Sequence, residues 1–502
     1  MAVDSDDRTG DHEAHPLLSE IPVNVPIGNG AKKLLVLTVC SLICLAADFG
    51  MYLSLAPQTA IFEQIICRNY SEFQGVGNNV TRGEDPWELA LILGYKSGFE
   101  VLPTIFLSLG YGFLSDHWGR KPVLYLAALG ITLSELWTRI VCAWPGIFPL
   151  RSVWLSSVWL LIGGGDQTMS FVAINMVADV VSEEERSNAL FRLSSFVVLS
   201  EVLAGPASAY LMRIDLWTPY ILGFAIATAG LTLIVFLPET LEDAKAKRVI
   251  QGTASGISAE FTLQPGKQFT VQALRHGVHE FKESIHFMWT DSNISWIIAV
   301  GFVSMMSRES TNILLQYTSK KFNWSIAQAG LLISIRGMVG IFCFSILMPG
   351  VTFLAVRYFD LHGKFRDYRL SQLMGLFGVI GFTVVGFAPT AGILITGLVI
   401  VSSSAAFMVT TRSLATSLVL PDHVGTLYSA LAISQSIGTF VAGPLFAYLF
   451  RLGMHLGSAW MGLPFLQAAV CFGFATAALW RIRLNRSLQS DEEGGAEESL
   501  VS

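Results

Sequence analysis

The sequence predicts an all-α polytopic membrane protein whose twelve transmembrane helices form two six-helix halves that repeat each other in parallel. Three observations support this prediction: the composition is apolar, the apolar residues gather in long runs, and two parts of the chain match at a constant spacing. Of the 502 residues, 52% are hydrophobic and 14% are charged, whereas soluble domains carry about 25% charged residues. A water-soluble globular enzyme is therefore not the expected class.

The apolar runs have the length of helical membrane spans. Each helical crossing needs about 20 apolar residues, whereas the strands of a membrane barrel have about ten residues of alternating polarity. Twelve runs meet the helical criterion. They cover residues 34–60, 89–114, 122–143, 153–177, 193–212, 219–237, 293–317, 328–354, 371–388, 391–418, 424–449 and 457–480.

The distribution of basic residues predicts the orientation of these spans. Loops that stay in the cytoplasm retain Lys and Arg, and most of the 32 Lys and Arg residues fall in the tails and loops on the side of the two termini. We therefore expect both termini in the cytoplasm. On the other side, Asn-x-Ser/Thr sequons make Asn69, Asn79 and Asn323 candidates for glycosylation.

The spans divide the chain into two bundles and three polar segments. An acidic tail expected to be disordered (1–33) precedes the amino-terminal bundle (34–238), and a cytoplasmic linker (239–291) leads to the carboxyl-terminal bundle (292–482) and a second acidic tail (483–502). Apolar residues recur every three or four positions late in the linker, which predicts an amphipathic helix on the membrane surface. No basic patch indicates nucleic acid as a partner.

The two bundles contain matching segments. Gly205-Pro206 in the fifth span recurs as Gly443-Pro444 in the eleventh, 238 residues later, and each pair is followed by Ala-Tyr-Leu and an Arg at the same distances. Gly-Pro in a span allows kinking and close helix packing. Parallel six-span repeats are typical of transporters that work by alternating access.

A charged motif lies between the second and third spans. Gly112, Asp116, Gly119, Arg120 and Lys121 have the spacing Gly-x-x-x-Asp-x-x-Gly-Arg-Lys. Gly112 allows two helices to approach closely, Gly119 allows a tight reversal, and the charged groups can exchange partners between two conformations. This loop resembles the one after the second span in the major facilitator superfamily.

Other segments extend the resemblance over the whole chain. The fourth span ends near Asp179 before an acidic loop that ends in Arg186, and the sixth ends in Pro238-Glu239-Thr240. The resemblance implies that Arg120 pairs with Asp179 and that Asp116 meets the eleventh span, so that these residues form a gate. The chain is most similar to fungal members near the drug or secondary-metabolite exporters and the proton-coupled folate transporters.

Ionisable residues inside spans are costly, and each is a candidate for function. Asp48, Asp166 and Glu201 are candidates for proton coupling, because removal from water penalises a charged carboxylate and favours uptake of a proton. In contrast, Lys96 with Glu100 and Glu135 with Arg139 are four residues apart and are expected to pair along one helix face.

The carboxyl-terminal half is the basic one and supplies the candidates for substrate binding. Arg336 stands alone in the eighth span and can bind an anionic group with two parallel hydrogen bonds. Arg308 and Asn312 of the seventh span are the other two candidates, although the adjacent Glu309 can neutralise Arg308.

These observations predict a secondary transporter of a small organic molecule, with proton-coupled efflux as the leading mechanism. The sequence has no phosphate-binding loop, nucleophile elbow or zinc box, so we expect no enzyme, no cofactor, no metal and a proton gradient as the energy source. The expected partners are the substrate, protons and the lipid bilayer, with the protein as a monomer.

Two alternatives remain open: a proton-coupled importer of a nutrient or vitamin-like anion, and a nutrient sensor without transport. The expected location is the plasma membrane, and a dileucine-like segment in the first tail leaves vacuolar or endosomal membranes open.

Overall fold

The computed structural model describes residues 30–74, 86–181, 183–242, 292–359, 363–419 and 424–481. Within these ranges the chain is helical and contains no strand, as predicted. Most of the predicted first tail, the second tail and most of the linker, including its amphipathic helix, lie outside the described residues. The last residues of the predicted first tail are helical, because α1 already begins at Gly30.

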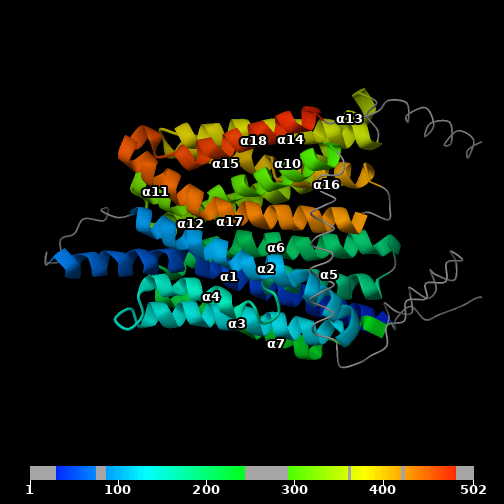
Figure 1. The fold of residues 1–502 in the computed structure, drawn as a ribbon, viewed down its shortest axis with the longest axis horizontal. Helices are drawn as coiled ribbons and strands as arrows, with labels where there is room; N and C mark the ends of the chain where they lie inside the picture. The colour runs from blue at the N-terminus through cyan, green and yellow to red at the C-terminus, as the bar shows by residue number, and fades with distance from the viewer. Residues whose placement is uncertain are drawn as a thin grey trace, which may run out of the picture.

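The amino-terminal half contains the first six predicted spans. Its helices are α1 (Gly30–Gln74), α2 (Pro86–Trp118), α3 (Arg120–Ala143), η1 (Leu150–Leu155), α4 (Ser156–Trp159), α5 (Gly165–Val180), α6 (Glu183–Leu211), α7 (Trp217–Thr232) and η2 (Leu233–Phe236). In Figure 1 these elements lie below and those of the other half lie above. The ends at Gly30 and Arg481 lie on the same face, at the right of Figure 1. We call this face the terminal face and the other end the opposite face.

The carboxyl-terminal half contains the other six predicted spans. Its helices are α10 (Ser292–Glu309), η3 (Ser310–Ile313), α11 (Leu314–Phe322), α12 (Ile326–Phe342), the π-helical η4 (Cys343–Leu347), α13 (Met348–Phe359), α14 (Gly363–Phe387), α15 (Ala391–Ser403), α16 (Ala406–Ser417), α17 (Val424–Leu456), η6 (Ser458–Trp460) and α18 (Leu463–Arg481).

Ten helices in the described residues are long and apolar enough to cross a membrane. The fourth and seventh predicted spans differ from the expectation because each is divided into shorter helices. The fourth is interrupted at Gly163, Gly164 and Gly165, all with positive φ of 77–88°, a conformation that favours glycine. Carbonyl groups freed by this break are satisfied by α2, since Tyr111 donates to the carbonyl oxygen of Leu161 at 3.0 Å. A break at membrane depth is tolerated only with such partners.

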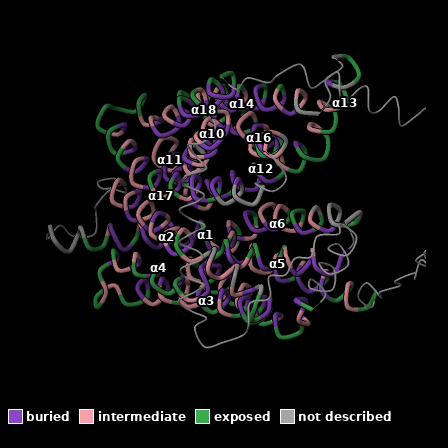
Figure 2. The backbone as a smooth tube through the Cα atoms, turned by 45° about the vertical axis from the view of Figure 1, so that its right-hand side comes forward, coloured by how far each residue is buried: buried purple, intermediate pink, exposed green. Residues whose placement is uncertain are grey.

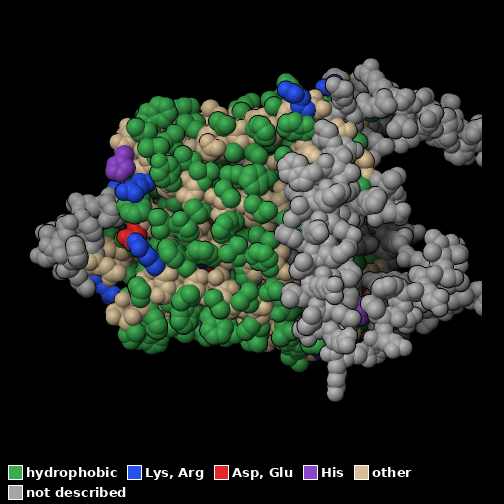
Figure 3. Space-filling view, viewed as in Figure 1, with side chains coloured by type: hydrophobic (Ala, Val, Ile, Leu, Met, Phe, Trp, Pro, Cys, Tyr) green, Lys and Arg blue, Asp and Glu red, His purple; other side chains and the backbone are tan. Residues whose placement is uncertain are grey.

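The surface is that expected for a protein surrounded by lipid. Figure 3 shows hydrophobic side chains over the middle of the molecule and Lys and Arg side chains toward the two ends. Buried residues concentrate where helices face one another, and the outward sides are more exposed (Figure 2). The apolar band and the charged ends together indicate an integral membrane protein.

Two helix pairs make most of the contacts between the halves, and they lie in the middle of the molecule (Figure 1); α1 also packs on α12. We call the contact between α2 and α17 the first seam and that between α6 and α12 the second seam. In the first seam the backbones of Gly94 and Gly443 touch, so that a Cβ atom on either residue would overlap the carbonyl of the other. In the second seam Gly205 packs directly on Ser334. Both Gly-Pro segments therefore lie where the halves pack closely.

Candidate functional site

The charged motif on the terminal face forms a compact cluster. Gly119, with φ of 119°, makes the tight turn between α2 and α3. The Nε atom of Arg120 pairs with Oδ2 of Asp179 at 3.2 Å, and both side chains are buried. This is the pairing that the family resemblance implies. The side chains of Asp116 and Arg186 lie outside the described part of the structure, so their gating roles stay predictions.

Glu239 is a member of this cluster that the sequence did not assign to the gate. Its carboxylate accepts the backbone N–H groups of Arg120 at 2.9 Å and Lys121 at 3.1 Å. A carboxylate at a helix amino terminus satisfies free N–H groups and complements the helix dipole. Next to it, the Thr240 hydroxyl donates to Oδ2 of Asp179 at 3.0 Å. The Pro-Glu-Thr ending of the sixth span was the feature of the sequence that could have indicated these contacts. Through them, Glu239 and Thr240 connect the end of that span to α3 and α5.

The amino-terminal half contains a network of charges within its spans. Lys96 pairs with Glu100 at 2.6 Å, and Arg139 pairs with Glu135 at 2.5 Å. Both predicted pairings along a helix are therefore confirmed. Asp166, in the first turn of α5 after the glycine break, lies within electrostatic range of Lys96, Glu100 and Glu135. The network thus joins α2, α3 and α5.

Arg139 is the most firmly held cation of this network. Its Nη2 atom donates to the Ser54 hydroxyl and to the Tyr220 carbonyl, each at 3.2 Å. Its guanidinium carbon lies 4.3 Å from the centre of the Tyr220 ring and 4.5 Å from that of Phe224. Such hydrogen bonds and cation–π contacts stabilise a buried cation. Arg139 therefore ties α3 to α1 and α7 and serves a structural role.

Asp48 and Asp166 differ from the other acids of this half. Neither makes a hydrogen bond or ion pair within the described part of the chain. Asp48 is half-buried in α1, and Asp166 is exposed. An unpaired carboxylate in a membrane span is costly in its charged form, so these two remain the acids with the most to gain from binding a proton.

Glu201 and Arg336 meet across the two halves, and this corrects the expectation that Arg336 stands alone. The Nε atom of Arg336 in α12 lies 2.7 Å from Oε1 of Glu201 in α6. The expectation was wrong because the partner is 135 residues away and in the other half, where helix periodicity gives no information. The pair also makes Glu201 a weaker candidate for proton coupling, because its carboxylate is already paired with a cation.

Comparison with known proteins assigns the chain to a family. Residues 38–443 match the family model of the Major Facilitator Superfamily. The chain belongs to the major facilitator superfamily. It is 32% identical to the MFS-type transporter avaK of Aspergillus versicolor, over 92% of this chain and 95% of that protein. It is also 32% identical to the MFS efflux pump atnC of Emericella nidulans, over 94% and 93%.

Solved structures of this superfamily have the same fold. The inward-open xylose transporter XylE of E. coli aligns over 91% of this chain and 97% of its own, with a TM-score of 0.60 and 14% identity. The human organic anion transporter MFSD10 aligns over 89% and 99%, with a TM-score of 0.56 and 18% identity. At these identities the likeness concerns the fold, and membership of the family identifies the chain as a membrane transporter.

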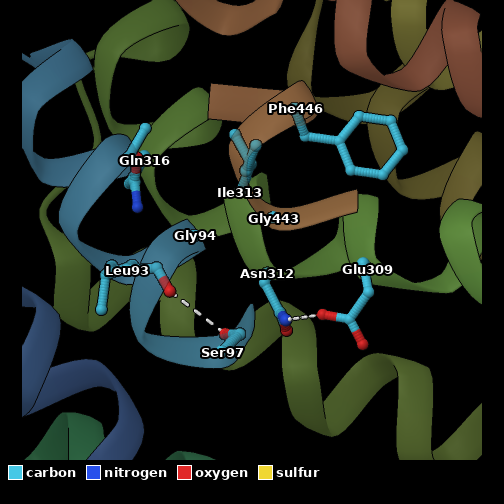
Figure 4. Close-up of a pocket in the computed structure, with 10 residues that line it drawn as sticks. Leu93, Gly94, Ser97, Glu309, Asn312, Ile313, Gln316, Gly443 and Phe446 are labelled. Atoms are coloured by element: carbon cyan, nitrogen blue, oxygen red, sulfur yellow. Dashed lines mark hydrogen bonds between the residues drawn. The ribbon is translucent and has the colours of Figure 1, made fainter. Parts of the chain in front are cut away.

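The transporter has a small pocket on the first seam, shown in Figure 4. Asn312 and Glu309 point toward one another there, and Nδ2 of Asn312 donates to Glu309 at 2.5 Å. Above them lies the amide of Gln316, whose buried Oε1 has no hydrogen-bond partner in the described residues. The pocket volume of about 20 Å³ suits one or two waters. Asn312, a predicted substrate contact, therefore lines a water-sized space in this conformation.

The remaining predicted positions are at the edges of the described structure. The Arg308 side chain and the sequon residue Asn79 lie outside the described part. Asn69 is exposed near the end of α1, and Asn323 is exposed at the carboxyl end of α11 with φ of 55°. The loop after Asn323 is short because Ser325 already caps α12. Glycosylation at these positions stays a prediction.

Proposed function

We propose that this transporter exports a small organic molecule, such as a drug or secondary metabolite, by alternating access in exchange for protons. The single observation that carries the proton-coupling part is an excess of acid in the amino-terminal half. Three carboxylates, Glu100, Glu135 and Asp166, share two cations, Lys96 and Arg139. Asp48 in α1 adds a fourth carboxylate.

Asp166 is the proposed proton carrier, with Asp48 as its neighbour in the same path. Asp166 is the acid of the network without an ion pair in the described residues, and it is exposed at a break in the fourth span. Broken helices mark binding sites in many transporters because they expose polar backbone near the middle of the membrane. A proton on Asp166 would leave Glu100 and Glu135 balanced by Lys96 and Arg139, whereas loss of that proton would leave one negative charge in excess among these five residues.

The seams support alternating access. Contacts between the halves run along α2–α17 and α6–α12, and Gly94 and Gly443 lie in the parts of α2 and α17 nearer the opposite face. A transporter packed in this way on one side must separate these helices to release substrate there. The name of the relative atnC, an MFS efflux pump, favours efflux as the direction. We propose the plasma membrane as the location, with cytoplasmic termini, and a vacuolar or endosomal membrane as the alternative.

Proton movement in proteoliposomes of known orientation tests the proposal. Planar aromatic acids and neutral polyketide-like compounds would be screened against a pH dye inside the vesicles. Protons should travel against the transported compound. Asp166→Asn should then flatten the pH dependence of transport, whereas Glu88→Gln should leave it unchanged, because Glu88 lies at the start of α2 and pairs with the exposed Arg151. Protons that travel with the compound would make this protein an importer and overturn the proposal.

A further inference from the structure

The ion pair of the second seam has an unused binding edge. Arg336 contacts Glu201 through Nε, and both Nη atoms have no partner in the described residues. The Arg336 side chain is 34% exposed, whereas that of Glu201 is 12% exposed. A guanidinium has five N–H donors in a planar fork that matches a carboxylate. Arg336 can therefore hold a second anion beside Glu201 or in its place.

Packing alone does not require this pair. The repeat spacing of 238 residues relates Arg336 to Gly98 in α2 and Glu201 to Thr439 in α17, the two helices of the first seam. There Gly98 packs on Phe440 without any charge. Because placing two charges within a membrane span is costly, a seam that carries them where its counterpart has none indicates a role beyond packing.

The Glu201–Arg336 pair lies where movement of one half relative to the other would break it. Gly337, next to Arg336, packs against Val202 and Glu201 of α6. If α6 and α12 separate, the pair must break, and each charge then needs a new partner. Water that enters the opened seam can solvate Glu201. Arg336 would be satisfied best by another carboxylate with the same planar geometry.

We propose that Arg336 binds the carboxylate or phenolate of an organic anion, which replaces Glu201 and thereby favours separation of α6 from α12. This inference rests on the proposed transport function for its physiological meaning, since it names the substrate class as organic acids. A ligand shifts a conformational equilibrium only through different affinities for the two states. An anion that takes the place of Glu201 has this property, because it needs the Nε edge of Arg336, which is free only after the pair has broken.

Benzoate binding to the purified full-length protein tests this inference, with benzamide as the neutral control. At constant pH and ionic strength, titration calorimetry should detect benzoate and not benzamide. Arg336→Gln should weaken benzoate binding at least about tenfold, as expected for loss of charge-assisted hydrogen bonds. Glu201→Gln should strengthen it because the competing carboxylate is gone. Arg412→Gln is the matched control, since Arg412 is exposed on α16 and bonds Gln435, and it should bind benzoate as the wild type does.

Two further measurements separate this inference from its alternatives. If Arg336→Gln does not fold, Arg336→Lys keeps the charge and removes the fork, and it should bind benzoate more weakly than the wild type. Spin labels at the exposed residues Tyr210 of α6 and Leu331 of α12 should move apart when benzoate is added. Equal affinity of the wild type and the Arg336 variants for benzoate would overturn the inference. Benzoate binding that leaves the distance between the two labels unchanged would also overturn it. Efflux confined to neutral compounds would overturn it while leaving the proposed function intact, whereas no efflux of any compound would refute the proposed function.

Discussion

The two seams between the halves are built from related helices but hold the halves together in different ways. In the first seam, Gly94 and Gly443 bring the backbones of α2 and α17 into contact. In the second, Gly205 packs on the side chain of Ser334, and the Glu201–Arg336 pair lies nearby. The difference shows that close packing is the feature the repeat preserves, whereas the Glu201–Arg336 ion pair is specific to one copy. Departures from an internal repeat are therefore good places to look for function.

The largest effect is expected when one methyl group is added to each seam. Gly443→Ala should abolish most transport and lower the stability by about 1–3 kcal/mol, a typical cost of overpacking, because the obstacle is the backbone of Gly94. Gly205→Ala should cost less, because the Ser334 hydroxyl is a smaller obstacle that can rotate. Thermal unfolding and transport of one compound would measure both effects.

A third glycine provides the control for these substitutions. Gly340 of α12 has no atom within 4 Å of a Cβ position, so Gly340→Ala should be tolerated. Helix propensity alone would make this change favourable by roughly 1 kcal/mol. If Gly443→Ala were as stable and active as Gly340→Ala, the contact between the backbones would not hold the halves together.

The charges of the second seam can be compared with their uncharged counterparts by a double-mutant cycle. Glu201→Gln and Arg336→Gln should each destabilise the protein, because each leaves a partly buried charge without its partner. The double variant should recover part of the loss, with a coupling energy of roughly 0.5–3 kcal/mol. Thr439→Val changes the corresponding position of the first seam and should have little effect. Additive losses from Glu201 and Arg336 would show that the two residues do not interact in the folded protein.

Much of the fold was predictable from the sequence because it depends on local patterns. Apolar runs located the spans, and spacings of four residues located the pairs Lys96–Glu100 and Glu135–Arg139. Counting apolar residues did not reveal the breaks in the fourth and seventh spans. A run of three glycines looks as apolar as its neighbours, and only the backbone conformation shows that Gly163 to Gly165 interrupt the helix.

The contacts that join distant segments were the part that the sequence did not predict. Arg336 was expected to be unpaired because its partner lies in the other half, and Glu239 was recognised only as part of a span ending. Both residues act through tertiary contacts that depend on how whole helices are placed. The Arg120–Asp179 pair, also between distant residues, was anticipated because the resemblance to a family supplied the spatial information that a single sequence lacks.

The smallest expected effect concerns a cation–π contact at the end of the first seam. The guanidinium carbon of Arg451 in α17 lies 4.2 Å from the centre of the Trp87 ring in α2, so this contact also crosses the halves near the opposite face. Its repeat counterpart, Arg213, follows α6 and is exposed. Arg451→Gln should weaken closure of the opposite face by about 0.5–2 kcal/mol, whereas Arg213→Gln should not. If the halves exchange between two arrangements, as proposed, even this small energy changes their populations several-fold. Distances between spin labels across the first seam would record the shift, and equal populations in the two variants would mean that Gly94 and Gly443 alone close that seam.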